Sequence, residues 1–512
     1  MDKVLQSNYE TVMDILKKAY SFRHARNVLE YDMQTISPSK GMAEQGETTA
    51  FIANEAYKLI TSEEFIKAAE YCYEHRFGSG TEEAPAEDGL SLPARVLMES
   101  LHRDYAKIKN VTPEKNMEWE LLTNNSYVKW LEAKEAKDFS VFAPTFDRVR
   151  AMNFERVSLR DEKKDIPYND LLDDYERGIT VADLDEWFGA CKERLIPLVE
   201  KVKNSKKVIR TDFLSKPVEI YRQEEIAKYL LQAMDFDFSR GAFTTTEHPF
   251  MMGIAKNDIR VTTHYRLNNF VSSMYSIIHE GGHALFGQLQ PAENYDYYLD
   301  DNMTMGMHES VSRFYENVIG RSRPFIRMVL PKLREITGGI LDDVSEEEMY
   351  EAVNFAEPSL VRIESDELTY TLHIIIRYEL EKGIMDGSLS TADIPKAWAD
   401  KYEEYLGVRP ENDADGCLQD VHWTWGYGYF PTYALGNMYN AMYYNRMIRE
   451  VDLEKVMESG SLKDLNSWMK EHVFANACYS TPKEWIREIT GREITPDDFL
   501  TNMENKYGEI YL

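Results

Sequence analysis

Hydrophobic residues near the N-terminus recur at the spacing of a helix. Val12, Ile15, Leu16 and Tyr20 fall on one face when three or four positions separate apolar residues. The chain from residue 9 to about 73 is therefore predicted to be helical. The same reasoning assigns a turn to 37–41, a second helix to 42–59 and an exposed loop to 76–93, which is rich in Gly, Pro, Glu and Ser.

Helical periodicity continues through most of the remaining chain. A long helical stretch is predicted at 95–137, with Trp119, Leu122 and Trp130 as core residues. Pro324 suits the first position of a helix. The other predicted helices cover 183–203, 223–234, 307–317, most of 324–382 with breaks at 337–339 and around residue 358, and most of the chain after 436.

The pattern changes between residues 235 and 265. Segments 235–241 and 244–250 are poor in helix-forming residues, and 258–265 alternates apolar and polar side chains with many β-branched types. That alternation predicts a strand in a small sheet beside the helix that carries His279 and His283. A second exception is 412–436, a long non-helical segment dense in Gly, Tyr and Trp, and loops of this length inside a compact domain are usually functional.

Together these elements predict a mainly α fold: one large helical body around a cleft, with a minor β element. Because the chain shows no repeat and no low-complexity linker, residues 1–512 are expected to form a single domain. The 43% hydrophobic content is typical of a globular protein.

One predicted helix carries candidate chemistry. His279 and His283 are four residues apart, so both imidazoles lie on one helical face, and Glu280 completes the H-E-x-x-H zinc pattern as a candidate general base. The alternative is a helix with two structurally satisfied histidines. Gly281 and Gly282 disfavour it, because mid-helix glycines each cost roughly 1 kcal/mol and suggest close approach of a substrate or metal.

A catalytic zinc needs a third protein ligand and an open position. Glu309 lies 26 positions after His283, on a helix that can fold back against the first. His308 is the rival ligand, and we favour Glu309 because His-His-Glu is a known peptidase ligand set.

Charge and cysteine content restrict the partners and the compartment. A net charge of -29, without a basic patch, argues against nucleic acid or anionic membrane as partner. It either repels acidic substrates or simply favours solubility, and solubility is the preferred interpretation. Four scattered cysteines, no apolar signal segment and no apolar run of roughly 18 residues predict a cytoplasmic protein.

The non-helical segment 412–436, which we call the aromatic loop, offers groups that could stabilise an oxyanion. They are His422, Tyr427, Tyr429 and Tyr433. Plain aromatic packing explains the same residues, and spacing does not separate the two interpretations. If the substrate is a free peptide C-terminus, Arg260 or Arg362 could bind its carboxylate. Each arginine could equally be half of a structural ion pair.

An ordered set of motifs makes the chain resemble the carboxypeptidase Taq family of metallocarboxypeptidases. The motifs are His248-Pro-Phe250, Asp258-Ile-Arg-Val-Thr262, His279-Glu-Gly-Gly-His283, His308-Glu-Ser310, Val361-Arg-Ile-Glu-Ser-Asp366, Gln419-Asp-Val-His-Trp423 and Gly428-Tyr-Phe-Pro-Thr-Tyr433.

The resemblance implies a zincin-type helical fold with a deep groove, similar to angiotensin-converting enzyme and neurolysin. Helices within about 1–140 would cover one side of the groove, and about 235–440 would be catalytic. It implies removal of C-terminal residues with broad specificity, poor action beside Pro, one Zn²⁺ per chain that Co²⁺ or Mn²⁺ could replace, and a homodimer acting on peptides.

The resemblance also implies roles for individual residues. His279, His283 and Glu309 would be the metal ligands and Glu280 the base, with Tyr429 or Tyr433 helping the oxyanion. Arg362 would bind the substrate carboxylate, and the motifs containing His248 and Arg260 would close the far end of the groove.

Two departures from the family pattern affect the site. Arg313 occupies the place where some other H-E-x-x-H peptidases have an Asp, so the partners of the metal ligands cannot be assigned from sequence. The segment from His422 to Tyr429 is one residue shorter than expected. The remaining alternatives are an oligopeptidase that cuts internally and a non-catalytic helical metal-binding protein.

Overall fold

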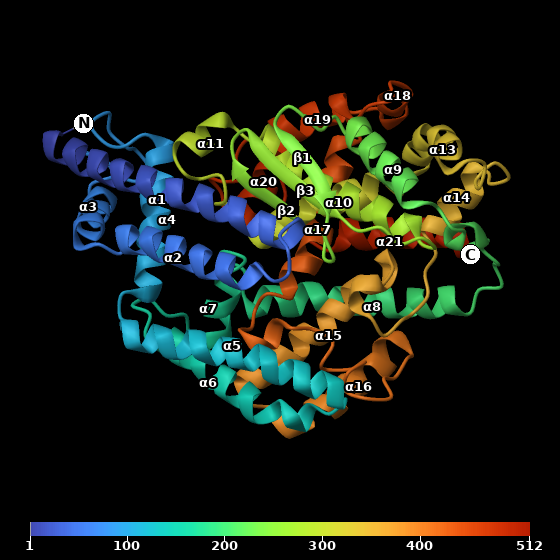
Figure 1. The fold of residues 1–512 in the computed structure, drawn as a ribbon, viewed down its shortest axis with the longest axis horizontal. Coiled ribbons are helices and arrows are strands. Elements are labelled where there is room, and N and C mark those ends of the chain that lie inside the picture. Colours follow the sequence, from blue (N-terminus) through green and yellow to red (C-terminus); the bar gives the residue numbers. More distant parts are fainter. Residues whose placement is uncertain (1) are drawn as a thin grey trace. The chain divides into compact units, whose positions relative to one another are not determined.

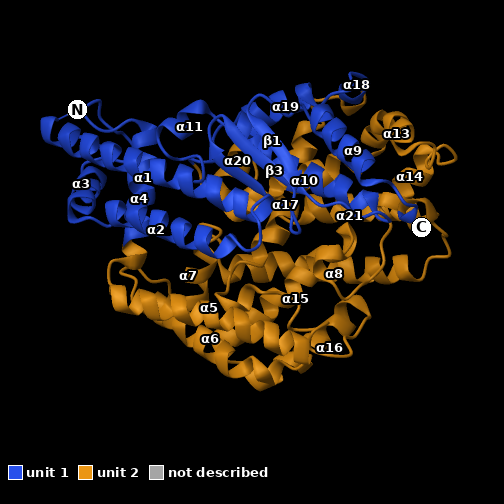
Figure 2. Ribbon diagram, in the orientation of Figure 1, with its two compact units in different colours: residues 1–105, 215–303, 455–479 blue, residues 106–214, 304–454, 480–512 orange. Residues whose placement is uncertain are grey.

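The computed structural model describes residues 2–512, which divide into two compact units (Figures 1 and 2). Each unit is assembled from three separate stretches of chain. Within the described residues, unit 1 comprises 2–105, 215–303 and 455–479, and unit 2 comprises 106–214, 304–454 and 480–512. Both are mainly helical, which confirms the predicted fold class.

Unit 1 combines helices with the small sheet. Its elements are α1 (Lys3–Thr35), α2 (Met42–Ile60), α3 (Glu63–Glu74), most of α4 (Leu92–Ile108), α9 (Ile220–Ala233), β1 (Gly241–Thr245), β2 (Met251–Ala255), β3 (Asp258–Thr263), α10 (Phe270–Leu289), α11 (Ala292–Asp296), most of α18 (Leu453–Glu458), α19 (Lys463–Trp468) and the π-helix η7 (Met469–Phe474).

The sheet lies beside helix α10, as the sequence predicted. Its strand order is β1-β3-β2, with β1 parallel and β2 antiparallel to the central strand β3. Ile259 and Val261 of β3 are buried, and a Cβ at Gly287 of α10 would lie 3.2 Å from the Ile259 side chain. The alternation seen in the sequence therefore marks the face of β3 that packs on α10.

Helix α10 begins at an Asn269 N-cap, whose side chain accepts a hydrogen bond from the Ser272 N–H, and most of its residues are buried. A Cβ at Gly281 would lie 3.0 Å from Met234 and 3.1 Å from Leu231. The small residue at 281 is thus explained by packing against α9, rather than by the expected approach of a substrate or metal.

Unit 2 holds the remaining helices. They are α5 (Pro113–Ala136), α6 (Ala143–Ser158), α7 (Pro167–Asp173), α8 (Val181–Lys203), α12 (Met305–Arg313), the π-helix η3 (Phe314–Ile319), α13 (Arg323–Thr337), α14 (Glu346–Val353), α15 (Glu367–Asp386), α16 (Ile394–Leu406), α17 (Pro431–Met447), α20 (Pro482–Thr490) and α21 (Asp497–Tyr511). Short 3-10 turns are η1 (Phe139–Val141), η2 (Asp212–Ser215), η4 (Arg362–Glu364), η5 (Thr391–Asp393) and η6 (His422–Thr424).

Helices α12 and α17 pack closely in unit 2. Gly436 permits this, because a Cβ there would lie 3.1 Å from the Glu309 Cγ and from the Ser310 backbone nitrogen. Helix α15 is almost wholly buried, although it carries Arg377 and Glu381, neither of which is exposed. Such charged groups need partners inside the protein.

Several predicted boundaries were wrong. The run 95–137 is two helices, because Thr112 caps a new helix at Pro113 by accepting a hydrogen bond from the Lys115 N–H. The loop predicted for 412–436 ends earlier, where α17 begins at Pro431, and Pro324 is the second rather than the first residue of α13. The three positions predicted for the core, Trp119, Leu122 and Trp130, are all buried.

Within residues 2–512, no helix is both long enough and apolar enough to cross a membrane. The four cysteines are buried, and none of them forms a disulfide bond within the described residues.

Candidate metal centre and its surroundings

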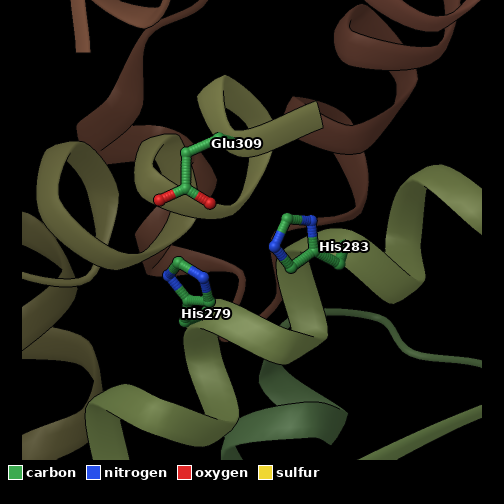
Figure 3. A group of neighbouring side chains, drawn as sticks. All are labelled: His279, His283 and Glu309. Carbon is green, nitrogen blue, oxygen red and sulfur yellow. The ribbon is translucent and has the colours of Figure 1, made fainter. Parts of the chain in front are cut away.

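Three side chains with metal-binding donors lie together. His279 and His283 project from α10 and Glu309 from α12, and one donor atom of each lies within 4.8 Å of the others. Figure 3 shows the two imidazoles and the carboxylate turned toward one another. Of the two candidates for the third metal ligand, the group contains Glu309, the preferred one, and does not contain His308.

The donor set suits zinc. Imidazole nitrogens and a carboxylate oxygen bind Zn²⁺ at about 2 Å, and atoms this close need only small side-chain rotations to share one ion. Glu280 follows His279 on the same helix and is only 9% exposed. Two imidazoles and one carboxylate can therefore hold a metal ion, and the carboxylate of Glu280, the residue next to His279, can accept a proton.

Glu309 is oriented by residues of its own helix. The Arg313 Nε donates to Glu309 Oε1 at 2.7 Å, and the Ser312 hydroxyl donates to Oε2 at 3.2 Å. The Arg313 guanidinium also lies over the Tyr370 ring, 3.7 Å from its centroid. Arg313, which stands where some other H-E-x-x-H peptidases have an Asp, is thus a partner of the candidate ligand Glu309. The two residues have the i, i+4 spacing typical of helical ion pairs.

A second cluster surrounds Asp420. Arg362 donates to Asp420 Oδ1 from Nε at 3.0 Å and from Nη2 at 2.8 Å, and Arg377 donates from Nε to Oδ2 at 2.6 Å. Burial alone would raise the pKa of Asp420, but Arg377 and Arg362 hold it well below its usual range. Two guanidiniums share one carboxylate, which leaves one net positive charge.

Tyr370 joins these two clusters. Its hydroxyl accepts a hydrogen bond from Arg362 Nη1 at 3.2 Å, and its ring carries the guanidinium of Arg313. A continuous chain of contacts therefore runs from Glu309 through Arg313 and Tyr370 to Arg362.

The aromatic loop separates into a polar cluster and a core residue. His422 Nε2 lies 3.4 Å from the Tyr433 hydroxyl, and the rings of Tyr429 and Tyr433 are 5.3 Å apart. Burial lowers the pKa of His422 to about 4, so the imidazole is neutral at pH 7. Tyr427 is different: it is 1% exposed and packs edge-on against Phe146, so its place is in the core.

Comparison with known proteins gives the family. The model of the carboxypeptidase Taq (M32) metallopeptidases matches residues 11–507. Carboxypeptidase 1 of Bacillus subtilis is 34% identical over 98% of both chains, and thermostable carboxypeptidase 1 of Thermus thermophilus is 32% identical over 99% of both. The chain belongs to the M32 carboxypeptidase family.

A solved structure agrees with this assignment. The crystal structure of the M32 carboxypeptidase from Deinococcus radiodurans superposes on this chain with a TM-score of 0.91, at 30% identity and full coverage of both chains. The resemblance inferred from the ordered motifs is confirmed. Members of this family are metallocarboxypeptidases, and a divalent metal is accordingly expected at the His279–His283–Glu309 group.

In this M32 chain a buried carboxylate fixes the aromatic loop. Glu381 of α15 accepts hydrogen bonds from the Gly428 N–H at 2.8 Å, the Tyr168 hydroxyl at 2.7 Å and Trp423 Nε1 at 2.9 Å. Burial raises the pKa of Glu381 to about 7. The backbone immediately before Tyr429 is therefore anchored to a helix.

Two residues that were predicted to bind the substrate, Arg260 and His248, belong to unit 1. Arg260 of β3 donates to Asp258 from Nε at 2.8 Å and from Nη2 at 2.7 Å, so it forms the ion pair left open by the sequence. With Tyr31 it lines a cavity of about 480 Å³ along strand β1. His248 lies in the connection between β1 and β2.

Sequence reasoning missed the partners of the predicted residues. Arg313 could have been found from its i, i+4 relation to Glu309. Arg377 and Glu381 gave a weaker signal, two charged residues within the apolar run of α15. Nothing in the spacing indicated that both would reach the segment around Asp420, since their contacts link residues more than forty positions apart.

Proposed function

We propose that this protein releases C-terminal amino acids from peptides, using zinc held by His279, His283 and Glu309 and the base Glu280. The observation that carries the proposal is the convergence of these three donors in a chain of the M32 family. Broad specificity and poor action beside Pro belong to the same proposal. Proline lacks the N–H that other residues can donate to the enzyme.

When bound, zinc would lower the pKa of water and polarise the scissile carbonyl. Glu280 accepts the proton of the attacking water and delivers it to the leaving amine. Because the carboxylate is nearly buried, its charge acts in a medium of low dielectric constant.

Side chains of the aromatic loop stabilise the charge that develops on the carbonyl oxygen of the substrate. The hydroxyl of Tyr429 or Tyr433 donates a hydrogen bond to this oxyanion. His422, neutral at pH 7, has one ring N–H for the same purpose.

Arg362 binds the substrate carboxylate. Asp420 neutralises only one of the two guanidiniums around it, so an incoming carboxylate balances the remaining positive charge. Tyr433, over whose ring the Arg362 guanidinium lies at 5.0 Å, contacts the peptide next to this carboxylate. Arg260 and His248 bind the substrate peptide at positions farther from its C-terminus.

The proposal extends to the cofactor and the assembly. One zinc ion binds per chain, and Co²⁺ or Mn²⁺ can replace it, since imidazole and carboxylate accept several divalent metals. We further propose a cytoplasmic homodimer. The family likeness supports dimerisation, and four buried cysteines that form no disulfide among residues 2–512 suit a reducing compartment.

Paired digestions test the proposed activity. A peptide and its C-terminally amidated form are incubated with the zinc-loaded enzyme and followed by mass spectrometry. We expect stepwise removal of C-terminal residues from the free peptide and little action on the amide. Equal cleavage of both would favour the internally cutting oligopeptidase, and no cleavage of either would favour a non-catalytic metal-binding protein.

A further inference from the structure

Unit 2 contains a cavity that the proposed chemistry does not use. It encloses about 330 Å³ and lies mainly between helices α17 and α21, with the π-helix η3 and the start of α13 at its edge. This volume is at the small end of ligand pockets, which span roughly 300–1,000 Å³. None of its lining residues belongs to the metal, catalytic or substrate set discussed above.

Both helices turn amide side chains into this cavity. On α17, Asn437 and Asn440 are three residues apart, and on α21, Asn502 and Asn505 have the same spacing. Residues at that spacing share one face of a helix. Asn437 and Asn440 are each 3% exposed, and buried helix contacts are normally apolar, so these two amides need a reason beyond packing.

Asn440 supplies the clearest indication of a ligand. The residue is 3% exposed and lines the cavity, and its amide atoms are not among the side-chain atoms that are both fully buried and without a partner in residues 2–512, so they face the open space of the cavity. Its neighbour Asn437 makes one long bond, donating to the Thr371 hydroxyl at 3.3 Å. An amide that faces a cavity in this way can donate and accept hydrogen bonds, so it is suited to a bound polar molecule.

The charged lining residues are balanced. Lys506 donates to Glu367 at 2.6 Å, and Arg323 donates to Glu509 at 2.7 Å. A simple anion would compete with these carboxylates for the cations. A molecule carrying both an ammonium and a carboxylate can instead add to a balanced pair, since the single Lys506–Glu367 bond leaves further donors and acceptors on both groups.

We propose that this cavity binds a free α-amino acid. Its carboxylate meets Lys506 and an amide N–H of Asn440, and its ammonium meets Glu367 and an amide oxygen. Tyr444, Phe499 and Met503 form an apolar wall that receives the amino-acid side chain. Binding here does not require the peptide hydrolysis proposed above, so the two can fail separately.

Equilibrium dialysis with radiolabelled leucine and phenylalanine tests the site. The wild-type chain is compared with Asn440→Leu, which keeps the volume but removes the amide, and with Asn204→Leu, the same change at an exposed residue outside the cavity. We expect saturable binding to wild type and to Asn204→Leu, and binding to Asn440→Leu that is weaker by roughly tenfold or more. The matching amino-acid amides and N-acetyl amino acids, each lacking one charge, should compete poorly.

Two further variants distinguish this cavity from the peptide-binding residues around Arg362. Asn505 is exposed at the cavity mouth, so Asn505→Trp blocks entry without altering the core and should also abolish binding. In Arg362→Gln, binding should persist. Loss of binding in Arg362→Gln with retention in Asn440→Leu would assign the amino acid to the peptide site and overturn the proposal. So would the absence of saturable binding to wild type, or equal binding of the amides and N-acetyl amino acids.

Discussion

Asp420 decides how Arg362 can act. An arginine whose guanidinium is already paired is usually a structural residue, and the two bonds to Asp420 fit that role. However, the same carboxylate also accepts from Arg377, so the cluster carries two positive charges against one negative. Buried charges of this kind are destabilising unless they are balanced. A substrate carboxylate would balance them, which makes the ion pair and substrate binding compatible roles of one residue.

Replacing Asp420 with Asn should destabilise the protein strongly. The change leaves two buried guanidiniums facing each other, and breaking a buried ion pair typically costs about 3–5 kcal/mol. Denaturant unfolding measures this loss. Asp400 is the control, because it also accepts from two cations, Lys396 and Arg409, but its side chain is 44% exposed, and Asp400→Asn should therefore cost much less. Similar losses in both variants would contradict the proposed charge balance around Asp420.

Glu280→Gln should remove activity while leaving the metal site intact. The amide keeps the shape of the side chain but cannot accept the proton of the attacking water, and general-base catalysis contributes about 10²–10⁴-fold. The measurements are kcat/KM on a free peptide and bound zinc by elemental analysis. Near-normal turnover with a full zinc content would show that Glu280 is not the base.

At the scale of elements, one face of α15 fixes the aromatic loop. Arg377 and Glu381 are four residues apart, so they lie on the same side of the helix. Arg377 holds Asp420 at the beginning of the loop and Glu381 holds Gly428 near its end. Gly428 has a φ of 93°, and a Cβ there would lie 2.7 Å from the Leu171 carbonyl oxygen, so glycine is required at this position.

The stability contributed by Glu381 should fall as the pH rises. Its folded-state pKa, about 7, is above the ordinary value, so the folded chain binds the proton more tightly than the unfolded chain does. Stability is therefore highest below the unfolded pKa and decreases up to about pH 7, by a quantity on the order of 3 kcal/mol.

The variant Glu381→Gln isolates this contribution. Gln cannot titrate, so the stability difference between wild type and variant should shrink between about pH 4.5 and pH 7. Urea unfolding at several pH values gives that difference. A difference that does not change with pH would mean that Glu381 is ionised throughout.

The sequence allowed the periodic elements and the metal-binding group to be predicted, because both depend on spacing within one segment. It did not predict β1 or β2, since Met251-Met-Gly-Ile-Ala255 has no alternation and its pairing with β3 is a non-local contact. The partners of Arg362 were missed for the same reason. By contrast, the helix start at Pro113 was signalled locally by the Thr-Pro pair and could have been found.

At the scale of the whole molecule, the net charge of -29 is the dominant electrostatic property. Such a field is weakened by salt, with a screening length of about 10 Å at 0.1 M. It acts on charged peptides before they reach the protein, so it should change association more than the chemical step.

Acidic peptides should therefore be poor substrates at low ionic strength. If the charge steers substrates, the ratio of kcat/KM for a Lys-rich peptide to that for a Glu-rich peptide should fall toward one between about 0.01 M and 0.5 M salt. A peptide without charged side chains serves as the control. A ratio that does not depend on salt would leave solubility as the role of the charge.

The division of each unit into three stretches of chain also has a consequence for biosynthesis. Unit 1 needs residues 455–479 and unit 2 needs 480–512, which are translated long after the first stretch of either unit. Domains made of one continuous segment can fold as they leave the ribosome, at about 5–20 residues per second. Here neither unit can be completed until these late segments have emerged. The helices formed first keep their apolar faces uncovered during that interval, and the nascent chain should therefore be a strong client of chaperones.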